Sequence, residues 1–133
     1  MEYESSEAII FNLVDYSNTS KIISFLSSSR GKISCIAKGI KRKNNPWRYF
    51  CDRLNLLEIQ YTWKPSREIQ TLTEMNLLNN YPAIKKDIYR QTLASLILEC
   101  AYNLTPKDEK AEPSFTTVKS AFDLINDDKT SIN

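Results

Sequence analysis

The residues best suited to chemistry are basic and aromatic side chains gathered between residues 30 and 53. This window of the 133-residue chain has one acid, Asp52, and a net charge of +7, whereas the rest of the chain carries −5. Its eight cations are Arg30, Lys32, Lys38, Lys41, Arg42, Lys43, Arg48 and Arg53. A block of one charge sign creates a local positive field on a nearly neutral protein. Because such a field attracts phosphate groups, the window predicts binding of a polyanion.

Aromatic residues alternate with cations in the second half of this window. Rings beside cations stack on bases for about 1–3 kcal/mol each, without reading sequence. We therefore predict a DNA-binding site formed by Lys32, Lys38, Lys41, Arg42, Lys43, Trp47, Arg48, Tyr49 and Arg53. With about five phosphates neutralised, log K should fall with log salt at a slope of roughly −3.5 on single strands. Two alternatives stay open: a solvated loop that serves solubility, and packing of the two aromatic residues onto the rest of the fold.

Catalytic chemistry is largely excluded by composition. Histidine is absent, so there is no Ser–His or Cys–His pair and no imidazole metal ligand. Glycine occurs only at positions 31 and 39, which cannot form a GxGxxG or GxxxxGK[ST] phosphate loop. Cys35, Cys51 and Cys100 contain no CxxC pair, and we expect three reduced packing cysteines and no metal site. We predict no enzyme, no cofactor and no small-molecule substrate.

The ends and the apolar stretches of the chain bear on its location. The N-terminus is acidic where a signal peptide is basic. The longest strongly apolar stretch, residues 93–98, is far shorter than the roughly 20 residues that a bilayer requires. We expect a cytoplasmic protein that does not enter a membrane.

Five short strands are predicted before residue 80 to position the basic window. They cover residues 8–16, 21–27, 32–38, 54–63 and 68–77. The third strand alternates, with Lys32 and Lys38 on its wet face. The two glycines bracket this strand, and Gly31 can take a positive φ in the turn before it. The fifth strand breaks the period of two, which predicts a bulge.

Helical periodicity replaces the strand pattern after Pro82. A first helix is predicted over residues 83–104 and a second from Pro113, with a charged linker at residues 107–112. The apolar face of the second helix holds Phe115, Val118, Phe122 and Ile125. Strands followed by helices indicate an α+β fold, and the commonest five-stranded barrel of this size is the OB-fold. We predict an OB-fold barrel in residues 1–79 and a helical segment in residues 80–133. The apolar stripe of the first helix either packs against the barrel or the second helix, or offers a docking groove for a partner helix or tail. Apolar surface left exposed there would cause self-association at high concentration.

Several of these segments resemble, in order, those of the bacterial recombination mediator RecO family. Residues 31–33, GKI, followed by residues 37–42, AKGIKR, resemble that family's GKI…AKGxRR segment. Residues 7–10 and 57–61 look like its first and fourth strands, and residues 72–99 like its passage into helices. The resemblance runs from about residue 7 to residue 126. It implies an N-terminal OB-fold, a helical domain and no catalysis by side chains.

The same resemblance implies a set of partners. Members of the family bind single- and double-stranded DNA, anneal complementary strands, and cooperate with RecR and the single-strand-binding protein SSB to load RecA at gaps. A place at the bacterial nucleoid follows. Two departures are visible: family members are longer and often carry a four-cysteine zinc cluster, whose spacing is absent here. Residues 50–54, FCDRL, replace a Leu-x-Pro-Phe-like entry to the fourth strand.

Two other functions are compatible with the sequence. One is a generic OB-fold module for RNA or single-stranded DNA. The other is a protein-interaction adaptor whose barrel docks a repair partner without appreciable DNA binding. Binding of an oligonucleotide across a salt series separates them, since the adaptor predicts no binding at physiological salt.

Overall fold

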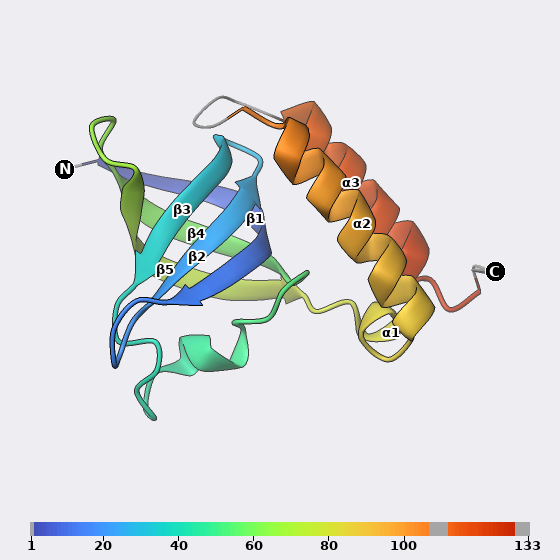
Figure 1. The fold of residues 1–133 in the computed structure, drawn as a ribbon, viewed down its shortest axis with the longest axis horizontal. Coiled ribbons are helices and arrows are strands. Elements are labelled where there is room, and N and C mark those ends of the chain that lie inside the picture. Colours follow the sequence, from blue (N-terminus) through green and yellow to red (C-terminus); the bar gives the residue numbers. More distant parts are fainter. Residues whose placement is uncertain (1, 107–111, 130–133) are drawn as a thin grey trace.

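The computed structural model describes residues 2–106 and 112–129, which form a strand barrel with helices packed on one side (Figure 1). The strands are β1 (Glu2–Asp15), β2 (Lys21–Ser27), β3 (Gly31–Ala37), β4 (Leu56–Trp63) and β5 (Ile69–Asn79). The helices are the 3-10 helix η1 (Pro46–Tyr49) and the α-helices α1 (Pro82–Lys85), α2 (Ile88–Leu104) and α3 (Glu112–Asn126). The predicted α+β class, with strands preceding helices, is confirmed.

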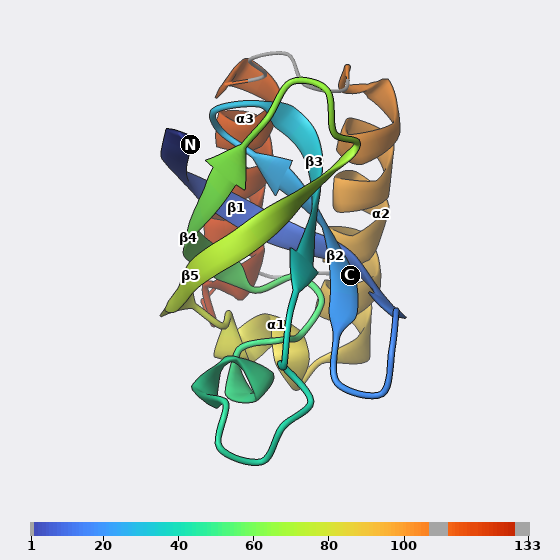
Figure 2. The ribbon, with the colours of Figure 1, turned by 90° about the vertical axis from the view of Figure 1, so that its left-hand side faces the viewer.

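The strands close into a barrel in the order β1-β2-β3-β5-β4. Every neighbouring pair is antiparallel except β3 and β5, which run parallel over three residue pairs, Ser34–Ile36 with Ile69–Thr71. Figure 2 shows β5 crossing β3 obliquely where the barrel closes. This arrangement is that of the OB-fold, so the predicted barrel is confirmed.

β1 is longer than its hydrophobic pattern predicts, because it begins at Glu2 rather than at residue 8. Its first half pairs with β4 and its second half with β2, so backbone pairing rather than burial extends it. The bulge predicted in β5 is confirmed: the pairing shifts by one residue between Gln60 and Tyr61 of β4, which leaves Thr73 of β5 unpaired.

Two apolar clusters account for the packing. One fills the barrel, and Ala8, Ile10 and Phe25 point into it. The other lies between the barrel and the helices, where Ile9 and Leu26 meet the apolar faces of α2 and α3. The barrel wall at β1 and β2 is therefore covered on both sides, which explains the unbroken apolar run at residues 8–10. The predicted face of α3 is confirmed, because all four of its residues are buried.

The single helix predicted over residues 83–104 is wrong, because the chain breaks between α1 and α2. Asp87 is extended at φ −127°, and its side chain accepts a hydrogen bond from the Tyr89 backbone N–H at 2.9 Å. An aspartate in this role starts a new helix. Residues 107–111 of the predicted charged linker lie outside the described residues. In the segments that the structure describes, no helix has the length and apolarity to cross a membrane.

Candidate nucleic-acid interface

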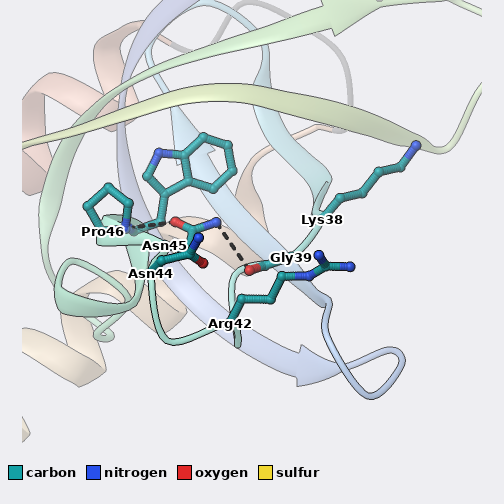
Figure 3. Close-up of a pocket in the computed structure, with 7 residues that line it drawn as sticks. Lys38, Gly39, Arg42, Asn44, Asn45 and Pro46 are labelled. Carbon is teal, nitrogen blue, oxygen red and sulfur yellow. Dashed lines mark hydrogen bonds between the residues drawn. The ribbon is translucent and has the colours of Figure 1, made fainter.

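Residues 38–55 connect β3 to β4 and contain most of the predicted site. Gly39 has φ +73°, a left-handed conformation that favours glycine. Its carbonyl accepts hydrogen bonds from the Arg42 backbone N–H at 3.0 Å and the Asn45 side-chain amide at 3.2 Å. The Asn45 side-chain oxygen in turn accepts from the Trp47 N–H at 2.8 Å, which caps η1. The loop is therefore fixed by its own hydrogen bonds (Figure 3).

An open groove of about 550 Å³ runs along this loop. It is lined by Lys38, Gly39, Arg42, Asn44, Asn45, Pro46 and Trp47. Figure 3 shows the side chains of Lys38 and Arg42 extending from the backbone on the side of the groove away from Pro46. Lys38, Arg42 and Lys43 are exposed, and none of the three makes a side-chain ion pair or hydrogen bond within residues 2–106 and 112–129. Their charges face solvent and are available to an anion.

The two aromatic residues of the predicted site differ in exposure. Trp47 is half-buried and packs with Phe50 against the barrel core, while also lining the open groove. Tyr49 is 75% exposed, and the Arg48 guanidinium carbon lies 5.9 Å from its ring centre. Tyr49 therefore has the free ring surface that stacking on a base requires, whereas Trp47 anchors the loop.

Lys41 points away from the open groove. Its Nζ lies 3.1 Å from Asp15 Oδ1 and donates to the Ser17 carbonyl at 2.9 Å. It helps to line a second cavity of about 430 Å³, formed by Asp15, Lys21, Ile40, Lys41, Arg48 and Cys51. Burial raises the pKa of the Cys51 thiol to about 11, so this thiol is neutral at pH 7. Lys21 lies outside the basic window and reaches this cavity because β2 pairs with β3, where Lys21 lies opposite Ala37. The sequence pattern did not assign Lys21 to the site, and only the pairing of β2 with β3 places it there.

Lys32 and Arg53 are placed away from both cavities. The Lys32 Nζ lies 5.1 Å from the ring centre of Tyr102 on α2, and the Arg53 guanidinium carbon lies 5.3 Å from that of Phe11 on β1. The rings of Phe11 and Tyr102 stack face to face, with centres 3.9 Å apart and planes 4° apart. We call this four-layer arrangement the seam stack, because it joins the barrel to α2. Lys32, near the start of β3, and Lys38, the residue directly after its end, are thus far apart along the strand.

Arg30, at the start of the basic window, is also engaged within the fold. Its Nε and Nη2 donate to the two carboxylate oxygens of Glu4 at 3.0 and 2.6 Å. Its guanidinium carbon lies 3.9 Å from the ring centre of Trp63. Tyr61 donates a further hydrogen bond to Glu4 at 3.1 Å. The hydrogen bonds from Arg30 hold the pKa of Glu4 below its ordinary value, against the opposing effect of burial.

The cysteines and acids do not gather into a metal site in the described residues, where no three potential ligands come together. All three cysteines are free thiols. Cys35 is buried in the barrel and Cys51 is half-buried, but Cys100 is exposed on α2. The expectation of a packing role is therefore wrong for Cys100.

Comparison with known proteins points to one family. The family model described as "Recombination protein O N terminal" matches residues 1–81. Relatives named DNA repair protein RecO include that of Rhodopirellula baltica, 29% identical over 119 residues, which are 90% of this chain and 44% of that protein. That of Salinibacter ruber is 23% identical over 91% of this chain and 46% of its own length. That of Syntrophobacter fumaroxidans is 25% identical over the whole chain and 52% of its own length.

These matches cover a larger share of this chain than of the relatives. The chain spans about half the length of the curated relatives it matches. The family model, in contrast, covers more than half of this chain, including all five strands of the barrel. The resemblance seen in the sequence and the barrel topology agree with that match. The chain therefore belongs to the recombination protein O family.

Proposed function

We propose that this chain is a non-catalytic DNA-binding module of a RecO-type recombination mediator. The observation that carries the proposal is the set of solvent-facing cations, Lys38, Arg42 and Lys43, on a hydrogen-bonded loop beside an open groove. The exposed ring of Tyr49 lies on the same loop. Cations track the phosphates and an aromatic surface accepts a base, which is the combination that OB-folds use on single strands.

Annealing of strands is part of this proposal and requires no acid or base. Phosphate contacts screen the repulsion between strands and leave base edges free to pair. Loading of RecA at gaps, with RecR and SSB as partners in the bacterial cytoplasm, belongs to the same proposal by family membership. So does the division into a barrel of residues 1–79 and a helical segment of residues 80–133, which the separate interior cluster of the barrel supports.

The test is fluorescence anisotropy with single-stranded DNA, double-stranded DNA and RNA oligonucleotides over a salt series. The variant Arg42→Glu/Lys43→Glu is compared with Lys64→Glu/Arg67→Glu, an equal charge change in the exposed turn between β4 and β5. We expect the first variant to weaken binding about 10–100-fold and to reduce the salt slope on single strands by about 1.4, the value for two lost phosphate contacts. Equal losses in both variants, or none in either, would contradict the assignment of the site.

A second candidate is a protein-interaction adaptor that docks its partner on the helices, where the apolar surface lies, rather than on the barrel as the sequence suggested. An apolar groove of about 520 Å³ lies between α2 and α3, and Leu96 and Leu104 beside it are 55% and 85% exposed. Exposed apolar surface of this kind marks sites of protein association. If the chain binds RecR but no oligonucleotide at physiological salt, its function is that of an adaptor and not of a DNA-binding module.

A further inference from the structure

The second cavity holds an excess of positive charge that the proposed DNA groove does not use. Lys21, Lys41 and Arg48 line it, with one carboxylate, that of Asp15. Ile40 and Cys51 supply apolar wall, and Ile40 is fully buried. In the part of the chain that the structure describes, the side chains of Lys21 and Arg48 make no ion pair or hydrogen bond. Three cations around a half-enclosed cavity are suited to a phosphate group.

This cavity and the open groove are lined by different residues of the same loop. Residues 38, 39 and 42 line the open groove, whereas residues 40 and 41 line the second cavity. Among the residues that the structure describes, the two cavities share no lining residue. Successive residues of one rigid loop therefore present cations to two different openings, because Gly39 turns the chain with its positive φ.

A carboxylate holds one of the three cations in the free protein. Asp15 pairs with Lys41 at 3.1 Å, yet its own side chain is 71% exposed, so it is solvated and easily displaced. A phosphate oxygen offers Lys41 the same charge-assisted hydrogen bond that the carboxylate makes. Asp15 thus acts as an internal competitor for an incoming anion.

We propose that the second cavity is a phosphate subsite that holds a second nucleic-acid strand while the open groove holds the first. This proposal rests on the proposed function and extends it. Two strands on either side of one cationic loop would lie close together with their charge screened, which is the arrangement that annealing requires. Lys21, Lys41 and Arg48 contact the backbone of the second strand, and Asp15 leaves Lys41 when that strand binds.

The main test counts strands by native mass spectrometry. Oligonucleotides of six bases are used, within the roughly 4–16-nucleotide site of an OB-fold. The wild-type chain should bind two non-complementary strands per monomer, and Lys21→Gln/Arg48→Gln and Lys38→Gln/Arg42→Gln should each bind one. A maximum of one strand on the wild type, with both variants weakened alike, would overturn the second subsite while leaving the proposed function intact. Absence of any strand would overturn the proposed function itself.

The variant Asp15→Asn tests whether the Asp15 carboxylate competes with an incoming phosphate for Lys41. Because Asp15 no longer has to be displaced from Lys41, binding of the second strand should strengthen several-fold, while its salt slope stays as in the wild type, since Lys41 contacts a phosphate in both complexes. Asn18→Asp, an added charge in the neighbouring β1–β2 turn, serves as the opposite control and should weaken that binding. An affinity for the second strand that is unchanged in Asp15→Asn would remove Lys41 from the subsite.

Cys51 provides a reporter inside the second cavity. In a Cys100→Ser background the accessible thiol is Cys51, since Cys35 is buried. A hexanucleotide should slow its alkylation more strongly than inorganic phosphate at the same total phosphate concentration. Equal protection by inorganic phosphate would show that the cavity takes a free anion and would overturn the assignment to a strand.

Discussion

Lys38, Arg42 and Lys43, in the middle of the basic window, face solvent, whereas Arg30, Lys32 and Arg53, near its ends, contact other parts of the fold. All six are cations of one short segment. Each cation near the ends lies over an aromatic ring: Arg30 over Trp63, Lys32 over Tyr102 and Arg53 over Phe11. Lys38, Arg42 and Lys43 have no such ring within the described residues, whereas Arg48, which follows them, lies beside Tyr49. Charge density therefore locates a candidate surface, while the neighbours supplied by the fold decide which charges can reach a ligand.

The largest expected effect concerns the seam stack. Replacing Tyr102 with alanine removes a half-buried ring that stacks on Phe11 at 3.9 Å. We expect the free energy of unfolding to fall by about 2–3 kcal/mol, less than for a fully buried aromatic residue. Chemical denaturation measures this change. Leu104→Ala, 85% exposed on the same helix, is the control and should change stability by less than about 0.5 kcal/mol. If Tyr102→Ala instead abolished DNA binding and left stability intact, the seam stack would be part of the DNA interface. The distinction between solvent-facing cations and cations that contact the fold would then be wrong.

Arg30→Gln should have the next largest effect. It removes a bidentate pair whose side chains are 30% and 25% exposed, and we expect a loss of about 1–2 kcal/mol at pH 7. The pKa of Glu4 is lowered in the folded state, so its stabilising contribution is present above its ordinary value of 4.5 and is lost as pH falls through the folded pKa. The wild type should therefore lose more stability than Arg30→Gln on acidification below pH 4.5, as followed by thermal unfolding. Parallel pH profiles would show that the pair does not stabilise the fold.

Gly39→Ala tests the rigidity of the middle of the window. A Cβ at this position has room, because the nearest atoms belong to the flexible Arg42 side chain at 3.6 Å. The cost comes from the positive φ, and we expect about 1 kcal/mol of lost stability, measured by denaturation. DNA affinity should fall in the same variant because Lys38 and Arg42 shift relative to each other. Asn44→Ala, in the same exposed loop, should leave stability unchanged.

The smallest overall effect is expected from Lys32→Gln/Arg53→Gln, which should cost about as much stability as Gly39→Ala but leave DNA binding unchanged. Exposed cation–π contacts contribute about 0.5–1 kcal/mol, and the aromatic pair remains in place. Stability should fall by about 1 kcal/mol, and the salt slope of DNA binding should stay as in the wild type. A slope reduced as much as in Arg42→Glu/Lys43→Glu would return both residues to the DNA interface.

Much of the fold was readable because its signals are local. Alternation in β3 and β4, the broken period in β5 and the 3, 4, 3 spacing on α3 each depend on residues a few positions apart. Asp87, in contrast, starts a new helix two residues after α1 ends, within a stretch whose apolar spacing continues through the break. The first half of β1 carries little hydrophobic signal, since its partner strand rather than its own side chains holds it.

The barrel class, the absence of histidine chemistry and the position of the cationic block follow from composition and from local sequence patterns. Tertiary structure alone decided how that block is divided. Arg53 meets Phe11 across 42 positions, Arg30 meets Glu4 across 26, and Lys21 joins Arg48 only because β2 lies beside β3. The physical reason is that a cation's availability depends on the ring, carboxylate or solvent around its charged end, and those neighbours come from distant segments.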